Sequence, residues 1–590
     1  MPRPKVKKIP VLEKLTGDDA ARYGALPKIP LPGASIMQRA FNADVAHVLK
    51  GKPLYRRDIL PVVPFDGRLR EMKPPNFISW ATEHFIPYKT RIDKDGDPHH
   101  VLFDMTEQVA KNCLSSDEFI LALPPIMRIH PSPVPLINDA GFLMLCTPGY
   151  DPSSGTYVHK GPLVPQTPDP ARPPLPNLVG SAGYFDDSMT LGEAFWYLYD
   201  LHFHFPFSDY GEVVTPPIGH PLHAFDPVSG DHRSFILSRS LAVHIGCMLA
   251  IFAGGCVESE AFRMIFAYNA NAQRSGKTLL AAIAAAITHG AFKRQPWSED
   301  EESRKKILDS EVLAGSPYIC FDNVRGLIQC QALEAFVTGA TWTGRHLGRS
   351  EMFTAENNAV IILTGNNITP GTDIQHRTLW CDLYVEDADP QARVIDAPIL
   401  DEVWLSKAKN RRAVLSALWA VVRHWDQAGR PPATGKPRQG FDVWGRIIGG
   451  MVEFAGFGDM LAMPKLQNAG DTESDDVAAL VRSLHSQRLA DYTFQQIVHT
   501  CWEGGLFPWN MRGREETFSL REDWPAVNSL RLDATCSSRM GLLLMRHATA
   551  RGTIHRVPDP TTGTPVPVRF HHIGKGRHRR FLLSSLITDH

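Results

Sequence analysis

The sequence predicts an α/β protein whose core alternates short apolar strands with helices. Three observations support this prediction. A tight loop at residues 271–278 (NAQRSGKT) lies between an apolar run at 264–267 and an alanine-rich run at 279–288. Two further apolar runs, 316–323 and 359–367, each end on polar side chains. Strand, loop and helix in this order form the context that a phosphate-binding loop requires.

The loop has the residue types that bind a nucleoside triphosphate. Backbone N–H groups at the start of the following helix carry partial positive charge and face the phosphates. Lys277 is expected to reach the β- and γ-phosphates of ATP, and the Thr278 hydroxyl to ligate Mg²⁺. The usual pattern has a glycine where Asn271 stands, and Arg274 adds bulk. The candidate ATP-binding residues are Gln273, Arg274, Ser275, Gly276, Lys277 and Thr278.

Polar residues after the next two strands complete the predicted site. Asp322 ends the first strand and is a second candidate for holding Mg²⁺, through water. Asn366, or less favourably Asn367, ends the second and is a candidate for positioning the attacking water. Arg377 follows where oligomeric ATPases place a finger for the neighbouring subunit's nucleotide. Each strand alone is consistent with an ordinary core strand, but the three in this order favour ATP binding.

Several segments in this order resemble the AAA+ helicases of mobile genetic elements. These are the ATPase parts of phage, plasmid and genomic-island primase-helicases, related to superfamily 3 and minichromosome-maintenance helicases. The resemblance covers about residues 120–460. The segments that carry it are 297–305 (WSEDEESRK), 321–324 (FDNV), 343–348 (TGRHLG) and 363–368 (LTGNNI), with Asp373 and Arg377 beyond them.

The resemblance implies an AAA+ P-loop ATPase core with a helical lid. It also implies a ring, expected to be a hexamer, that moves along single-stranded or forked DNA, with a primase or initiator as a possible partner. One departure concerns catalysis: Asn323 follows Asp322, so the glutamate common in AAA+ proteins is absent. Glu302 could supply the base instead, or could be an exposed helix carboxylate paired with Lys305 or Lys306.

A hairpin before the second of these strands is the expected DNA contact inside the ring. In related helicases a hairpin at this location projects into the pore and grips DNA phosphates. The candidates here are Arg345, His346 and Arg349. Two alternatives stay open: Arg345 belongs to the intersubunit ATP site, or the segment is a surface hairpin.

Two predicted helices have residues with specific expected roles. Thr190 with Glu193 predicts a capped helix over 190–202. Arg411 or Arg412, in a helix predicted at 410–425, could touch the nucleotide, although an exposed helix arginine is the commoner outcome.

Composition shifts divide the chain into six predicted segments. The segments are an N-terminal α+β accessory domain (1–160), a proline-rich linker or loop (161–180), the ATPase core with preceding helices (181–395), a helical lid (396–462), a linker (463–476) and a C-terminal domain (477–590).

The C-terminal domain is predicted to be a winged helix that binds DNA. Helices are expected at 476–485, 492–502 and 538–548, followed by strands at 566–570 and 579–583. From residue 537 onward there are nine Lys or Arg against two Asp, which favours salt-sensitive contacts with phosphates. A basic tail without a specific partner is the alternative. The candidate DNA-binding residues are Arg569, Lys575, Arg577, Arg579 and Arg580.

Overall composition limits the remaining choices. The formal net charge of −1 gives no general basic field, so nucleic-acid contacts must be local. The nine cysteines form no C-x-x-C pair, which predicts neither zinc nor disulfides and favours a reducing, cytoplasmic location in a bacterial or phage-encoded protein. Apolar runs are too short to span a membrane. The expected function is an ATP-dependent DNA helicase; the alternatives are a replication initiator or defence-system ATPase, and a DNA-binding protein with a decayed ATPase.

Overall fold

The computed structural model divides the chain into two compact units. The first spans residues up to 368 together with 376–464, and the second comprises 369–375 and 465–590. The boundary after residue 464 lies inside the predicted 463–476 linker, whereas most of the predicted proline-rich segment lies outside the described residues. The described residues are 24–161, 163–166, 180–328, 330–346, 351–366, 368–385, 400–436, 438–463, 472–487, 489, 491–503, 518–520, 530–532, 540–541, 544, 548, 553–558, 565–573 and 580–585.

The N-terminal part of the first unit combines short helices with small sheets whose strands pair mostly antiparallel. The buried Arg57 guanidinium donates to the carbonyl oxygens of Met127 (2.6 Å) and Val312 (2.9 Å), so this part and the central sheet share one unit. The elements are β1 (Lys28–Pro30), η2 (Ser35–Met37), α2 (Gln38–Val48), β2 (Tyr55–Arg57), β3 (Leu60–Phe65), β4 (Arg68–Glu71), α3 (Pro74–Ala81), β5 (Ile86–Ile92), β6 (Pro98–Leu102), α4 (Glu107–Leu114), α5 (Asp117–Ala122), β7 (Arg128–His130), β8 (Val134–Ile137), β9 (Leu143–Cys146), β10 (Gly149–Asp151) and β11 (Thr156–Val158).

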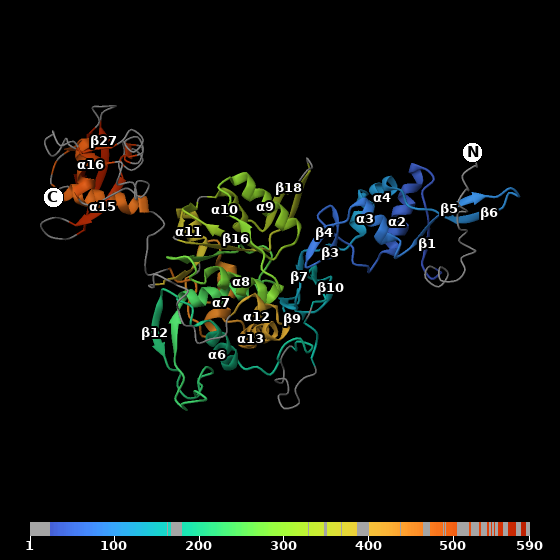
Figure 1. The fold of residues 1–590 in the computed structure, drawn as a ribbon, viewed down its shortest axis with the longest axis horizontal. Coiled ribbons are helices and arrows are strands. Elements are labelled where there is room, and N and C mark those ends of the chain that lie inside the picture. The colour runs from blue at the N-terminus through green and yellow to red at the C-terminus, as the bar shows by residue number, and fades with distance from the viewer. Residues whose placement is uncertain are drawn as a thin grey trace. The chain divides into compact units, whose positions relative to one another are not determined.

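A five-stranded parallel sheet forms the centre of the first unit (Figure 1). Its strands are apolar and buried almost throughout, as expected for a parallel sheet covered on both faces. The strand order is β15-β16-β20-β14-β22, so β20 separates β14 from β16. The strands are β14 (Ile265–Ala270), β15 (Gln295–Pro296), β16 (Tyr318–Val324), β20 (Val360–Asn366) and β22 (Thr378–Leu383).

Helices flank this sheet, and their sequences explain where they begin. The predicted helix at 190–202 is confirmed: the Thr190 side chain accepts from the Glu193 amide, and Glu193 caps in return. The helices predicted for the lid are present and pack on α6, α7 and α8. The helices of the first unit are α6 (Leu191–His202), α7 (Arg239–Phe252), α8 (Lys277–His289), α9 (Glu301–Leu313), α10 (Gln331–Val337), α12 (Glu402–Ser406), α13 (Ala408–Gln427) and α14 (Asp442–Phe454). The short helix α11 (Thr372–His376) falls almost wholly in the second unit.

Two antiparallel hairpins leave the body of the first unit. One pairs β12 (Tyr210–Val214) with β13 (Phe235–Ser238), and the other pairs β18 (Thr341–Arg345) with β19 (Met352–Glu356). The second occupies the position of the predicted pore hairpin. The short strands β17 (Leu327–Ile328) and β21 (Thr369–Pro370) are the remaining elements between β16 and β22.

The second unit combines helices with a four-stranded antiparallel sheet of order β23-β28-β27-β26. The strands predicted at 566–570 and 579–583 correspond to β27 and β28, which pair antiparallel. The helix predicted at 538–548 lies mostly outside the described residues. The elements are α15 (Thr472–Ser486), β23 (Asp491–Tyr492), α16 (Phe494–Glu503), β24 (Phe518–Leu520), β25 (Leu530–Leu532), β26 (Thr553–Pro558), β27 (Pro565–Ile573) and β28 (Arg580–Ser585).

Two whole-chain features can be checked in the described part. The cysteines described there are all free and buried. In the same residues, no helix combines the length and apolar character needed to cross a bilayer.

Candidate functional site

The loop between β14 and α8 turns sharply before the helix begins. Arg274 (φ 61°) and Gly276 (φ 96°) both take left-handed backbone angles, which are uncommon outside glycine. At position 276 a β-carbon would also lie 3.1 Å from the Phe205 ring, so glycine is required there. No side chain caps α8, whose first residue is Lys277. Its leading N–H groups therefore remain available to an anion.

Asn271, the departure from the usual glycine, has a structural role. Its side-chain amide donates to the Val385 carbonyl (2.8 Å) and accepts from the Val385 amide (2.9 Å). These two bonds fasten the start of the loop to the chain just beyond β22. Asn271, which stands where the usual pattern has glycine, thus anchors the loop.

Lys277, Thr278 and Asp322 meet at the carboxyl-terminal edge of the sheet. The Thr278 hydroxyl donates to Asp322 Oδ1 at 3.4 Å, and the Thr364 hydroxyl bonds the same oxygen. Partial burial lowers the pKa of Lys277, and the Asp322 charge opposes that shift. Threonine and aspartate oxygens suit Mg²⁺, which also retains water and phosphate ligands in such sites. Among the described residues no larger cluster of metal-binding side chains occurs.

Two buried oxygens near this edge have no hydrogen-bond partner within the described part of the chain. They are Ser275 Oγ in the loop and Asn366 Oδ1 at the end of β20. Asn366 is in register with Ala270, the last residue of β14, so both oxygens lie where the strands end. Buried polar atoms are usually satisfied, which makes these two atoms available to a ligand.

Arg294 is a participant that sequence reasoning missed. Its guanidinium forms an ion pair with Asp322 Oδ2 at 2.9 Å, while its side chain is 54 % exposed. It precedes β15, a strand of only two residues. So short a strand has no detectable pattern, and a lone arginine before it gave no signal.

The position of the missing glutamate is occupied by a strained asparagine. Asn323 has φ 60°, and its amide donates to the Thr364 hydroxyl at 3.4 Å. Glu302 is 68 % exposed and pairs with Lys306 at 3.8 Å along α9. Glu302 is therefore an exposed helix carboxylate paired with a lysine, the second of the two alternatives above. Among the described residues no contact joins it to Asp322.

Arg377 contacts α10 of its own chain. Its Nη1 donates to the Glu334 carbonyl at 3.1 Å, and its own carbonyl accepts from Ile265. The arginine thus lies directly before β22. Its predicted contact with a neighbouring subunit remains a prediction.

Arg411 and Arg412 take other places than predicted. Arg411 is 3 % exposed and donates to the carbonyl oxygens of Ile287 and Thr288 at the end of α8. Arg412 donates to the Tyr184 carbonyl at 2.7 Å. Neither is an exposed helix arginine, because each is at least partly buried and donates to backbone carbonyls.

The predicted hairpin residues differ in accessibility. Arg345 is exposed, and its amide donates to Asp309 at 3.1 Å. His346 is 6 % exposed and packs against the Phe353 ring at 5.3 Å, so its prediction as a DNA contact is poorly supported. Arg349 lies outside the described residues.

Few of the predicted C-terminal DNA contacts can be located. Arg580, on β28, is exposed and pairs with Asp491 at 3.6 Å. Arg569 lies on β27 with its Nε buried and without a hydrogen bond in the described residues. Lys575, Arg577 and Arg579 lie outside the described residues.

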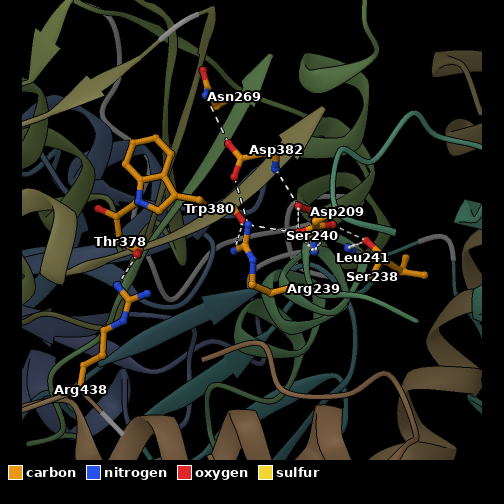
Figure 2. A network of polar contacts seen from close by, with 10 residues as sticks. All are labelled: Asp209, Ser238, Arg239, Ser240, Leu241, Asn269, Thr378, Trp380, Asp382 and Arg438. Atoms are coloured by element: carbon orange, nitrogen blue, oxygen red, sulfur yellow. Dashed lines mark hydrogen bonds and ion pairs between the residues drawn. The ribbon is translucent and has the colours of Figure 1, made fainter. Parts of the chain in front are cut away.

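A polar network not anticipated from the sequence holds the sheet beside the loop (Figure 2). Arg239, at the start of α7, forms ion pairs with Asp382 (3.0 Å) and Asp209 (3.2 Å). The Asn269 amide donates to Asp382 at 3.3 Å, which joins β14 to β22. Burial raises the pKa of Asp382, although the charge of Arg239 counteracts it. The network therefore clamps the strand that leads into the phosphate loop.

Comparison with known proteins adds little to this geometry. No protein family and no curated protein matches the sequence. One solved structure, the apo A form of the NrS-1 C-terminal region, is weakly similar, with 9 % identity and a TM-score of 0.33 over 91 % of this chain and 98 % of that one. A score this low carries no argument about fold or function.

Proposed function

We propose that this chain is an AAA+ type ATPase that translocates on DNA as a ring, in the replication of a mobile element. The observation that carries the proposal is the meeting of Lys277, Thr278 and Asp322 below an uncapped helix start. The strand order supports it further, because β20 brings Asn366 between the loop strand and the Asp322 strand.

The proposed roles follow from the chemistry of each group. The α8 amides and Lys277 bind the phosphates of ATP, and Thr278 with Asp322 holds the Mg²⁺ side. Bound Mg²⁺ neutralises charge on the β- and γ-phosphates. Asn366, whose Oδ1 lacks a partner, orients the attacking water. Arg377 of a neighbouring copy stabilises charge on the transferred phosphoryl group.

The proposed DNA contacts are Arg345 on the β18–β19 hairpin and the basic residues of the second unit. Arg345 is exposed at the end of its strand, where a phosphate can approach it. Arg580 is exposed as well, on the β27–β28 pair. Contacts of this kind give affinity that falls with salt and depends little on sequence.

Two observations favour the second candidate, a DNA-binding protein whose ATPase has decayed. Arg294 already pairs with Oδ2 of Asp322, the proposed Mg²⁺-holding carboxylate, and Asn323 stands where a catalytic glutamate is common. A replication initiator or defence-system ATPase shares the site chemistry and differs only in lacking processive unwinding.

ATP turnover measured with and without single-stranded DNA tests the proposal. We expect DNA-stimulated turnover in the wild type and none in Lys277→Ala, while Lys111→Ala on the distant α4 surface behaves as wild type. Binding of ATP without turnover supports the decayed ATPase. Turnover without strand displacement on a forked substrate supports the initiator.

A further inference from the structure

A cavity of about 490 Å³ lies at the beginning of β16 and the end of α8. Residues from β4, from 159–161 and from 289–295 also line it, whereas none of residues 271–278 does. It is therefore distinct from the phosphate loop. Its volume is in the range of small-molecule sites.

Arg411 brings a buried positive charge to this cavity, and no carboxylate of the described residues pairs with it. It is 3 % exposed, and its hydrogen bonds go to the neutral acceptors Ile287 O, Thr288 O and Ser132 Oγ, the last at 2.8 Å. Among the described residues Nη1 has no partner. A β-carbon at Gly290 would lie 2.8 Å from that nitrogen, so glycine keeps the approach to it open. Burial lowers the pKa of Arg411 to about 10. A buried charge without a counter-ion is costly.

Three further cations line the same cavity: Arg68, Lys160 and Lys293. Burial, together with the positive charge of Arg68, lowers the pKa of Lys293. The Lys293 ammonium has no ion pair among the described residues. With Arg411, four cationic side chains line the cavity.

Two carboxylates line the cavity, so its charge stays positive. Glu311 is already engaged, since it accepts from Gln295 (2.9 Å), from Arg68 (3.4 Å) and from the Ser316 hydroxyl. Asp66 is the other carboxylate in the lining. Four cations against two anions leave an excess of two positive charges.

The end of α8 would by itself repel an anion, because a helix C-terminus carries about half a negative charge. Arg411 donates to two of these terminal carbonyls and so offsets that field. The positive side chains therefore dominate the cavity.

We propose that this cavity binds a phosphorylated small molecule, with the phosphate groups held by Arg411, Lys293 and Lys160. A ligand with a diphosphate group matches both the charge excess and the convergence of cations from separate elements. Nη1 of Arg411 offers one donor nitrogen that no described residue uses, and arginine and lysine side chains are the usual partners of phosphate. The ligand would replace the counter-ion that the protein does not provide.

The test is calorimetric titration of the full chain with inorganic pyrophosphate, in a Lys277→Ala background that disables the phosphate loop. We expect saturable binding that Lys293→Glu weakens at least tenfold and that Lys111→Glu leaves unchanged. Lys160→Glu, on an exposed residue, repeats the test should Lys293→Glu fail to fold.

Three results would overturn the proposal. The first is that pyrophosphate does not bind the Lys277→Ala protein. The second is that it binds equally well after charge reversal at both Lys293 and Lys160. The third is that a twelve-nucleotide thymidine oligonucleotide binds in a Lys293-dependent way while pyrophosphate does not, which would assign the cations to a DNA strand.

Discussion

The phosphate loop and the cavity at the end of α8 differ in how the protein balances the positive charge of their side chains. At the loop, Asp322 faces Lys277 and pairs with Arg294, so both cations have a carboxylate of the protein beside them. In the cavity, Arg411 is buried against neutral acceptors only. The buried charge of Arg411 is the one that the proposed phosphate ligand would balance.

Lys277→Ala should give the largest effect and separates the two sites. Loss of the ammonium that binds the phosphates should lower ATP turnover by at least about 10²-fold, comparable to removing a key electrostatic donor. Pyrophosphate binding in the cavity should persist. Steady-state turnover and calorimetry measure the two effects, and equal loss at both sites would erase the distinction between them.

If Arg377 acts as the proposed arginine finger, Arg377→Ala should reduce turnover by about 10³-fold or more while ATP binding is retained. The guanidinium donates to the Glu334 carbonyl of its own chain at 3.1 Å, so reaching a neighbouring nucleotide requires that bond to break. Single-turnover kinetics with a fluorescent nucleotide would report both quantities. Unchanged turnover removes Arg377 from the site.

Asn271→Ala should lower the free energy of unfolding of the first unit by about 1–3 kcal/mol, because two hydrogen bonds to Val385 are lost. ATP affinity should fall as the loop loosens, whereas the cavity should be unaffected. Scanning calorimetry measures the stability, with Asn112→Ala on the surface of α4 as a control. A wild-type melting temperature would show that the anchor is dispensable.

Arg294→Ala should have the smallest effect and tests the charge matching at Asp322. An ion pair this exposed contributes less than about 1 kcal/mol. Removing it should lower the Mg²⁺ concentration for half-maximal turnover by up to about fivefold, because a competing cation is gone. A magnesium titration of turnover measures this. A higher magnesium requirement would instead make Arg294 a contributor to phosphate binding.

Sequence reasoning located the core strands because their patterns are local. The apolar runs leading to the loop, to Asp322 and to Asn366 became β14, β16 and β20, and the Thr190 cap began α6 as predicted. It failed for Arg294, Arg411 and the Arg239 network. In each case the partner lies far along the chain, and nothing near the arginine indicates whether its charge will be buried.

By itself, the sequence determined which segments become strands and helices and which residues follow each strand, since hydrophobic period and capping are short-range properties. Only the tertiary structure decided which of these residues share a site. Parallel strand pairing brings Thr278 to Asp322 across 44 positions, and packing of α13 on α8 brings Arg411 to Ile287 across 124. Burial then set the electrostatics, because the cost of a charge depends on how much water and which counter-ions surround it.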